Sequence, residues 1–181
     1  MVVVPKHVLI KTDNFYFETT IRYYTNKKEY LKNEYGNYFI ILKEDQIQSI
    51  TYDNRGIAKN GLGKYKEAIK DFDEAIKINS EDAAVYDNRG IAKAGLGKYK
   101  EAIQDFDRAI ELNPEDPNTY YNRANAKHKS RPCGEAIPDL DKAIELDPMF
   151  AKAYKNRAFI KRESGKYGEA LEDTLRAFKL S

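Results

Sequence analysis

The sequence predicts an all-α solenoid of antiparallel helix hairpins, and three observations support this fold class. Tyrosines recur every 34 residues, at Tyr52, Tyr86, Tyr120 and Tyr154. Residues 52–79 and 86–113 differ at only five of 28 positions, which chance does not produce. Within each unit the apolar residues have the spacing of a helical stripe. A fixed period of this length indicates stacked helical repeats.

The composition of the chain does not favour a nucleic acid or a membrane as its partner. Charged residues make up 33% of the 181 residues, yet the net charge is only +2, so no strong attraction to nucleic acid or to an anionic membrane is expected. The single cysteine, Cys133, allows no intramolecular disulfide, which suits a reducing compartment. No apolar run approaches the roughly 20 residues that span a bilayer. We therefore expect a cytoplasmic location.

Each unit reads as two helices separated by glycine and proline signals. Tyr65, Ile69, Phe72 and Ile76 fall on one helical stripe and mark the second helix of the first unit. The preceding helix carries small residues that permit close packing. Gly95-Leu96-Gly97-Lys98 interrupts the chain within the second unit, and Asn113-Pro114-Glu115-Asp116-Pro117 interrupts it between units.

These repeats resemble those of the tetratricopeptide repeat (TPR) family. The family pattern of small, aromatic and proline residues is matched in the second unit by Tyr86, Gly90, Tyr99, Ala102, Phe106, Ala109 and Pro114. The first unit departs at Ser80, and the fourth departs at Ala158 and Thr174. The resemblance covers about residues 49–181 and implies a right-handed superhelix. It divides the chain into repeats at 49–82, 83–116, 117–150 and 151–181, without a capping helix after the fourth.

The N-terminal residues 1–48 form a divergent segment with no clean repeat. We expect a degenerate helical hairpin at about 13–46 that caps the array, since terminal repeats are commonly atypical. The alternative is a small extended element, because Val2–Thr12 and Phe15–Tyr24 are rich in β-branched and aromatic residues.

The third unit is irregular, and all four units carry an unusual charge pair. Pro138 lies inside the expected second helix of the third unit and predicts a late or kinked start. Cys133 replaces a core tyrosine and is expected to be a buried, inert thiol. Arginine recurs at 55, 89, 123 and 157, and aspartate at 71, 105, 139 and 173. We expect each arginine to pair with the aspartate of its own unit, because an arginine held between helices needs a carboxylate partner.

The resemblance implies that the first helices line a concave, peptide-binding groove. Asparagine stands at one groove position in all four units, and its amide can both donate and accept hydrogen bonds to a peptide main chain. The alternative is that these asparagines bond only to neighbouring helices. The other groove positions are acidic in the first two units and aromatic or basic in the last two. The expected peptide-binding residues are Asn54, Asn88, Asn122, Asn156, Asp53, Asp87, Tyr121, Asn125, Lys152, Lys155, Phe159 and Arg162.

The sequence therefore predicts a module that binds another protein or peptide, not an enzyme. No metal site or cofactor is expected, because His7 and His128 lack companions at ligand spacing. Two alternatives remain: a homo-oligomer or homodimer through Leu171, Leu175 and Phe178, and an RNA-associated module, which the near-neutral charge disfavours. Binding of chaperone C-terminal tails is not expected, since Asp53 and Asp87 stand where the family's carboxylate clamp has lysine, and Asn156 where it has arginine.

Overall fold

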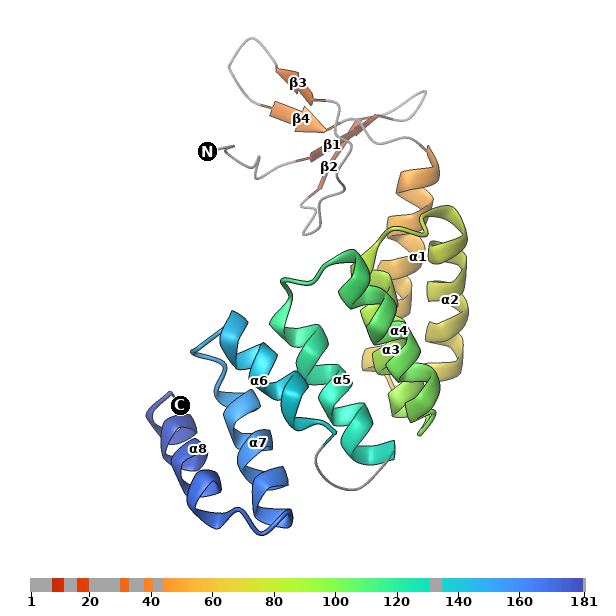
Figure 1. Ribbon diagram of the computed structural model, residues 1–181. Helices are drawn as coiled ribbons and strands as arrows, with labels where there is room; N and C mark the ends of the chain where they lie inside the picture. Colours follow the sequence, from red (N-terminus) through yellow and green to blue (C-terminus); the bar gives the residue numbers. More distant parts are fainter. Residues whose placement is uncertain are drawn as a thin grey trace.

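The computed structural model describes residues 8–11, 16–19, 30–32, 38–40, 44–130 and 135–180, and within them eight helices stack as successive hairpins (Figure 1). This confirms the predicted helical solenoid. Equivalent first helices begin 34 residues apart, at Ala83, Pro117 and Ala151. The helices are α1 (Glu44–Gly61), α2 (Tyr65–Ile78), α3 (Ala83–Gly95), α4 (Tyr99–Leu112), α5 (Pro117–Ser130), α6 (Ile137–Leu146), α7 (Ala151–Glu163) and α8 (Tyr167–Lys179).

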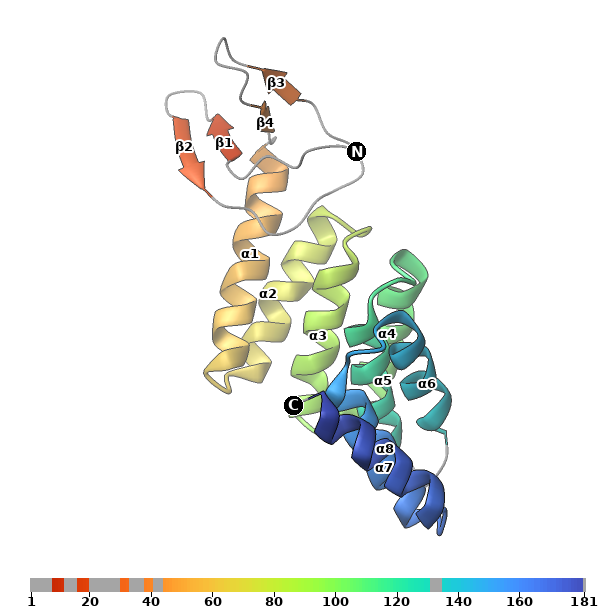
Figure 2. The same ribbon diagram turned by 90° about the vertical axis from the view of Figure 1, so that its left-hand side faces the viewer.

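The described N-terminal residues form strands, so the helical capping hairpin expected over about 13–46 is wrong. Strands β1 (Val8–Lys11) and β2 (Tyr16–Thr19) pair antiparallel, as do β3 (Tyr30–Lys32) and β4 (Tyr38–Ile40). Figure 2 shows these hairpins beyond the N-terminal end of α1. Because β-branched and aromatic side chains favour a pleated surface, the extended alternative is the one that the structure supports.

The turn within a hairpin is set by one glycine in the left-handed region. Gly63, Gly97 and Gly165 have φ of 74°, 76° and 77°. At the first turn the N–H of Lys64 donates to the carbonyl of Lys59 at 2.9 Å, and that of Gly63 donates to Asn60 at 3.0 Å. This pair of bonds is a Schellman motif, which satisfies carbonyls at the end of α1 and requires a residue that tolerates positive φ. The chain can therefore reverse within three residues.

The second helix of the third unit begins late, as predicted from Pro138. The equivalent of Tyr65, where α2 begins, is position 133, whereas α6 begins at Ile137. Pro138 lies in the first turn of α6, where its missing N–H removes no helical hydrogen bond. The expectation for Cys133 concerns a position outside the described residues.

The core lies between the two helices of a hairpin and the first helix of the next. Phe72, Phe106 and Leu140, at equivalent places in the first three units, are fully buried. The cluster around Phe72 includes Val85 and Ala92, which belong to α3 of the following unit. Each unit therefore depends on its successor to complete its apolar core, as expected for a solenoid.

Candidate functional site

The first helices α1, α3, α5 and α7 are linked by a row of side-chain amides. The Nδ2 of Asn88 donates to Asp53 at 3.1 Å, and that of Asn122 donates to both oxygens of Asp87 at 3.2 Å. The Nδ2 of Asn156 donates to Oδ1 of Asn125 at 2.6 Å. Three of the four amides thus make the bonds to neighbouring helices that the alternative interpretation requires. Each amide still has further donor and acceptor capacity, so a role in gripping a peptide remains a prediction.

We call the surface formed by α1, α3, α5 and α7 the first-helix face. Its acidic half holds two carboxylates whose pKa values are raised above the usual range. Burial raises the pKa of Asp53 to about 6, against the lowering effect of the Asn88 amide, and Asp82 adds to the rise. Burial likewise raises the pKa of Asp87 to about 6. Amides partner both groups, but an amide offsets the burial of a charge less well than a cation does. Near neutral pH the face therefore carries two ionised carboxylates that a cationic ligand group would stabilise.

Replacing Asp87 by asparagine is expected to stabilise the protein at pH 7.5 by about 1 kcal/mol. A shift of two units corresponds to about 3 kcal/mol, and the buried amide of the new asparagine removes part of that gain. Because the folded carboxyl holds its proton to about pH 6 and the unfolded one loses it near 4, this group's stabilising contribution is present at low pH and is lost as pH rises through 4–6. The advantage of Asp87→Asn should therefore grow over that range in urea titrations. An advantage that shrinks with rising pH would contradict this assignment.

The predicted arginine–aspartate pairs are confirmed in all four units. The guanidinium of Arg89 donates from Nε and Nη2 to the two oxygens of Asp105 at 3.0 and 2.7 Å. The same bidentate geometry, with distances of 2.5 to 2.9 Å, joins the other three pairs, which are Arg55 with Asp71, Arg123 with Asp139, and Arg157 with Asp173.

These pairs belong to a larger network that the sequence interpretation missed. A lysine four residues after each arginine reaches the same aspartate; Lys93 lies 2.7 Å from Asp105. The third guanidinium nitrogen of Arg89 also donates to Asp73 of the preceding unit at 2.7 Å. The signal was available, because these partners recur at the same period: lysines 59, 93, 127 and 161, and aspartates 73, 107 and 141. The network joins one unit to the next and is structural.

In the aromatic half of the first-helix face, the aromatic side chains make two separate groups of contacts. Phe159 meets His128 edge to face at 5.8 Å between ring centroids, and the Arg162 guanidinium lies 5.3 Å from the Phe159 ring centroid. Tyr121 packs instead against Phe150, at the start of α7, with ring centroids 5.2 Å apart. Lys152 and Lys155 are exposed. The structure thus brings Phe159 and Arg162 together and leaves cations accessible around them.

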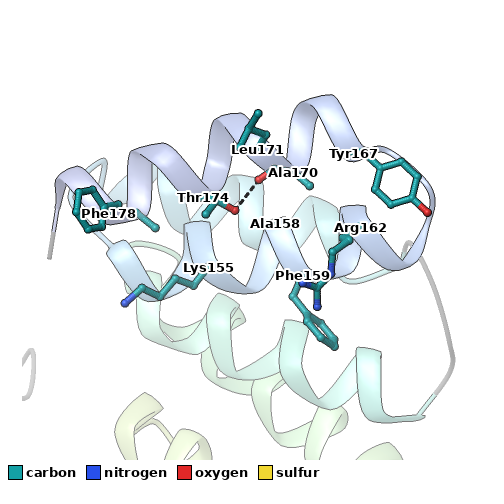
Figure 3. A pocket seen from close by; sticks show the side chains of 10 residues that line it. Lys155, Ala158, Phe159, Arg162, Tyr167, Ala170, Leu171, Thr174 and Phe178 are labelled. Carbon is teal, nitrogen blue, oxygen red and sulfur yellow. Dashed lines mark hydrogen bonds between the residues drawn. The ribbon is translucent and has the colours of Figure 1, made fainter.

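A groove of about 650 Å³ opens at the C-terminal end of the array, between α7 and α8 (Figure 3). Among the described residues no cluster of histidine, cysteine and carboxylate side chains could hold a metal ion. Nor does any helix in the described ranges have the length and apolarity needed to cross a membrane. We call the surface between α7 and α8 the terminal groove. Its lining residues are Lys155, Ala158, Phe159, Arg162, Tyr167, Ala170, Leu171, Thr174, Ala177 and Phe178.

Comparisons with known proteins agree with this architecture. MamA (residues 41 to the end) from Desulfovibrio magneticus RS-1 is 23% identical, with a TM-score of 0.68 over 73% of this chain and 75% of that one. The first TPR of Spaghetti (RPAP3), solved bound to the HSP90 peptide SRMEEVD, is 24% identical, with a TM-score of 0.64 over 66% and 94%. The Arabidopsis OM64 TPR domain is 24% identical, with a TM-score of 0.64 over 66% and 98%. At such identities the likeness concerns the fold.

Sequence comparison points the same way. No curated protein sequence matches the chain. The TPR repeat family model matches residues 59–97 and 94–130, which include most of the near-identical part of the first two units. Residues 59–130 therefore contain TPR repeats, and helix hairpins continue at the same 34-residue period on either side of them.

Proposed function

We propose that the protein is an interaction module that holds an extended peptide or a partner helix along the first-helix face. The observation that carries this proposal is the separation of charge on that face. Asp53 and Asp87 lie on α1 and α3, whereas exposed Lys152, Lys155 and Arg162 lie on α7. Complementary charge fixes the orientation of a ligand and speeds its association. A ligand with a basic segment toward α1 and an acidic segment toward α7 satisfies both ends.

Exposed apolar side chains on the same face support this function. Ile57 on α1 and Phe159 on α7 are 38% and 44% exposed, so each leaves apolar surface available to a partner. The asparagine amides lie between them and can bond a peptide main chain without reading its side chains. The described residues include no cluster that could hold a metal ion. We propose no catalytic role and a cytoplasmic location.

A double substitution of exposed residues tests the proposal without disturbing the amide row. Ile57→Glu with Phe159→Glu is expected to abolish recovery of the partners that the unaltered protein captures from a lysate. The control is Leu62→Glu, in the turn after α1, where the side chain is 73% exposed. Circular dichroism checks that both variants fold. Equal recovery of every partner by the double variant would show that the first-helix face does not bind them.

Peptides ending in Glu-Glu-Val-Asp are expected to bind weakly or not at all. Held as in the family's carboxylate clamp, their carboxylates would meet Asp53 and Asp87, which are mostly ionised at pH 7.5 given their pKa of about 6. Like charges brought together at an interface cost several kcal/mol. Isothermal titration with the peptide SRMEEVD, to which the first TPR of Spaghetti was solved bound, provides the measurement. Tight, salt-sensitive binding that requires Lys152 would overturn this expectation.

A homo-oligomer is the second candidate function. Leu171, Leu175 and Phe178 on α8 are 60%, 53% and 79% exposed, and together they form an apolar surface. If two copies meet there, Leu175→Glu should convert a larger species to a monomer in light scattering. An RNA-associated role is the least supported, because the net charge of +2 provides little affinity for phosphates.

A further inference from the structure

Among the second helices in the part of the chain that the structure describes, only α8 presents the large apolar side chains of its stripe to solvent. Tyr167, Leu171 and Phe178 of α8 are 70%, 60% and 79% exposed. Their equivalents in the first unit are Tyr65, Ile69 and Ile76, which pack against the cluster that contains Val85 and Ala92 of α3. Figure 3 shows Tyr167 and Phe178 at opposite ends of α8, with Lys155 and Arg162 along α7 below. The groove thus has the apolar character of the surface that α3 covers in the first unit.

The array itself shows what kind of helix covers such a surface. In each following unit, the covering helix presents two buried residues of small to medium size seven positions apart, which are Val85 and Ala92, Thr119 and Ala126, and Ala153 and Ile160. In the first of these interfaces a Cβ built on Gly95 would lie 2.7 Å from the Tyr65 ring, whereas the later covering helices carry Lys129 and Glu163 at the equivalent place. An amphipathic helix with a seven-residue repeat of small apolar residues therefore matches the terminal groove.

The terminal groove differs from the equivalent surfaces of α2, α4 and α6 at the position that contacts the arginine of the next unit. Asp73, Asp107 and Asp141 each accept a hydrogen bond from the arginine of the next unit. The equivalent residue of α8 is Leu175, which is 53% exposed. The only first helix of a second copy without a preceding unit is α1, and its Arg55 would lie against this leucine. That arginine would keep its own Asp71, but its third guanidinium nitrogen would meet an apolar side chain, so head-to-tail stacking of this chain would lack the ion pair that joins the other units.

The rim of the groove is also different, because it is basic. Lys155 stands where the first two units have Asp53 and Asp87, and Arg162 stands where they have Asn60 and Ala94. Both cations line the groove and are exposed, and within the described part of the chain neither has a carboxylate at ion-pair distance. A ligand with acidic flanks complements this rim and a basic ligand does not.

We propose that the terminal groove binds an amphipathic helix of another protein. That helix carries small apolar residues seven positions apart, acidic residues along its flanks, and no arginine opposite Leu175. This inference goes beyond the peptide-binding function proposed above, because α8 supplies most of the contact surface and does not contribute to the first-helix face. The two surfaces share Lys155, Phe159 and Arg162, so the test below uses α8 variants to separate them.

The probes are two fluorescein-labelled synthetic helices of about 18 residues, long enough to be partly helical in water. Both carry the seven-residue apolar repeat; one has glutamate on its flanks, and the other has lysine at the same places. In anisotropy titrations with the full chain, the glutamate peptide is expected to bind about tenfold more tightly than the lysine peptide. The double variant Lys155→Glu, Arg162→Glu should reverse that preference, and Leu171→Glu should weaken both peptides by about tenfold.

Paired substitutions at Leu175 and in the peptide test whether the peptide lies in the terminal groove. Placing arginine in the glutamate peptide opposite Leu175 should weaken its binding, and Leu175→Asp should restore it, since that pair rebuilds the contact between Arg89 and Asp73. Met149→Glu, in the connection before α7, and Ile57→Glu, on α1, are controls expected to leave binding unchanged. A loss with Ile57→Glu would assign the peptide to the first-helix face and overturn the proposal. Equal binding of both peptides, or a dimer of the chain alone that Leu171→Glu dissociates in sedimentation velocity, would also overturn it.

Discussion

Asp105→Ala is expected to destabilise the array by about 3–5 kcal/mol. Asp105 is a buried carboxylate that accepts two hydrogen bonds from Arg89 and a third contact, at 2.7 Å, from Lys93. The side chains of Arg89 and Lys93 are only 17% and 15% exposed, so alanine leaves two largely buried cations without their main partner. Breaking one side of such a pair costs more than the pair itself contributes, because the remaining charge stays desolvated. Guanidinium unfolding followed by circular dichroism measures the loss.

The matched control is Asp71→Ala in the first unit. The geometry of the pair is the same, with contacts of 2.9 and 2.7 Å from Arg55, but the Arg55 side chain is 54% exposed and no earlier unit covers it. Water can solvate Arg55 when its partner is removed, so the loss should be smaller. Because repeat arrays can unfold in parts, both variants are compared by midpoint and by hydrogen exchange of the flanking helices. Equal losses at the two sites would contradict the assignment of the effect to burial.

The arginine–aspartate pairs could be predicted because sequence and geometry share one period. Arginine and aspartate occur at the same two places in every unit, so a pair in one hairpin implies the pair in all four. The lysine and the second aspartate also recur but were missed. A guanidinium has five donors, and only the structure shows that the third nitrogen of Arg89 turns to Asp73 of the preceding unit.

Two other features could not be read from the sequence. Short aromatic and β-branched runs fit either a helix or a strand, so the helical cap expected over about 13–46 fell on a segment whose described residues pair as β1 with β2 and β3 with β4. The repeat also identifies Asn88 and Asn122 as special but not the direction of their amides, which depends on the neighbouring helix. The bonds to Asp53 and Asp87 appear only when α1, α3 and α5 are placed side by side.

The packing within a hairpin follows a rule that becomes visible only when sequence and structure are combined. In the first two units glycine faces a fully buried phenylalanine, as Gly90 faces Phe106. In the third unit, at the same two positions, Ala124 accompanies Leu140, and both are completely buried. The smaller leucine leaves room for the alanine Cβ. The side chains at the two positions therefore fill one shared volume in the core, and the effect of changing one depends on the other.

Gly90→Ala is expected to destabilise the protein by about 2 kcal/mol, although alanine is the better helix former. A Cβ at this position would lie 2.6 Å from Cε1 of Phe106, whose ring is 1% exposed and has little space to move. Overpacking of a core costs about 1–3 kcal/mol, which exceeds the gain of about 1 kcal/mol in helix propensity. Chemical denaturation gives the difference. The control is Gly61→Ala, at the end of α1, where nothing lies within 4 Å of the added Cβ, and there a small stabilisation is expected.

The double variant Gly90→Ala, Phe106→Leu decides whether the ring is the cause. It reproduces the pairing of Ala124 with Leu140, so it should lose less stability than the two single variants together. Losses that simply add would mean that the alanine Cβ clashes with something other than Phe106. In the fourth unit the same two positions hold Ala158 and Thr174, and both line the terminal groove. Filling that space with Thr174→Phe should therefore destabilise the fourth hairpin unless Ala158→Gly accompanies it, because the ring would meet a Cβ that the first two units lack.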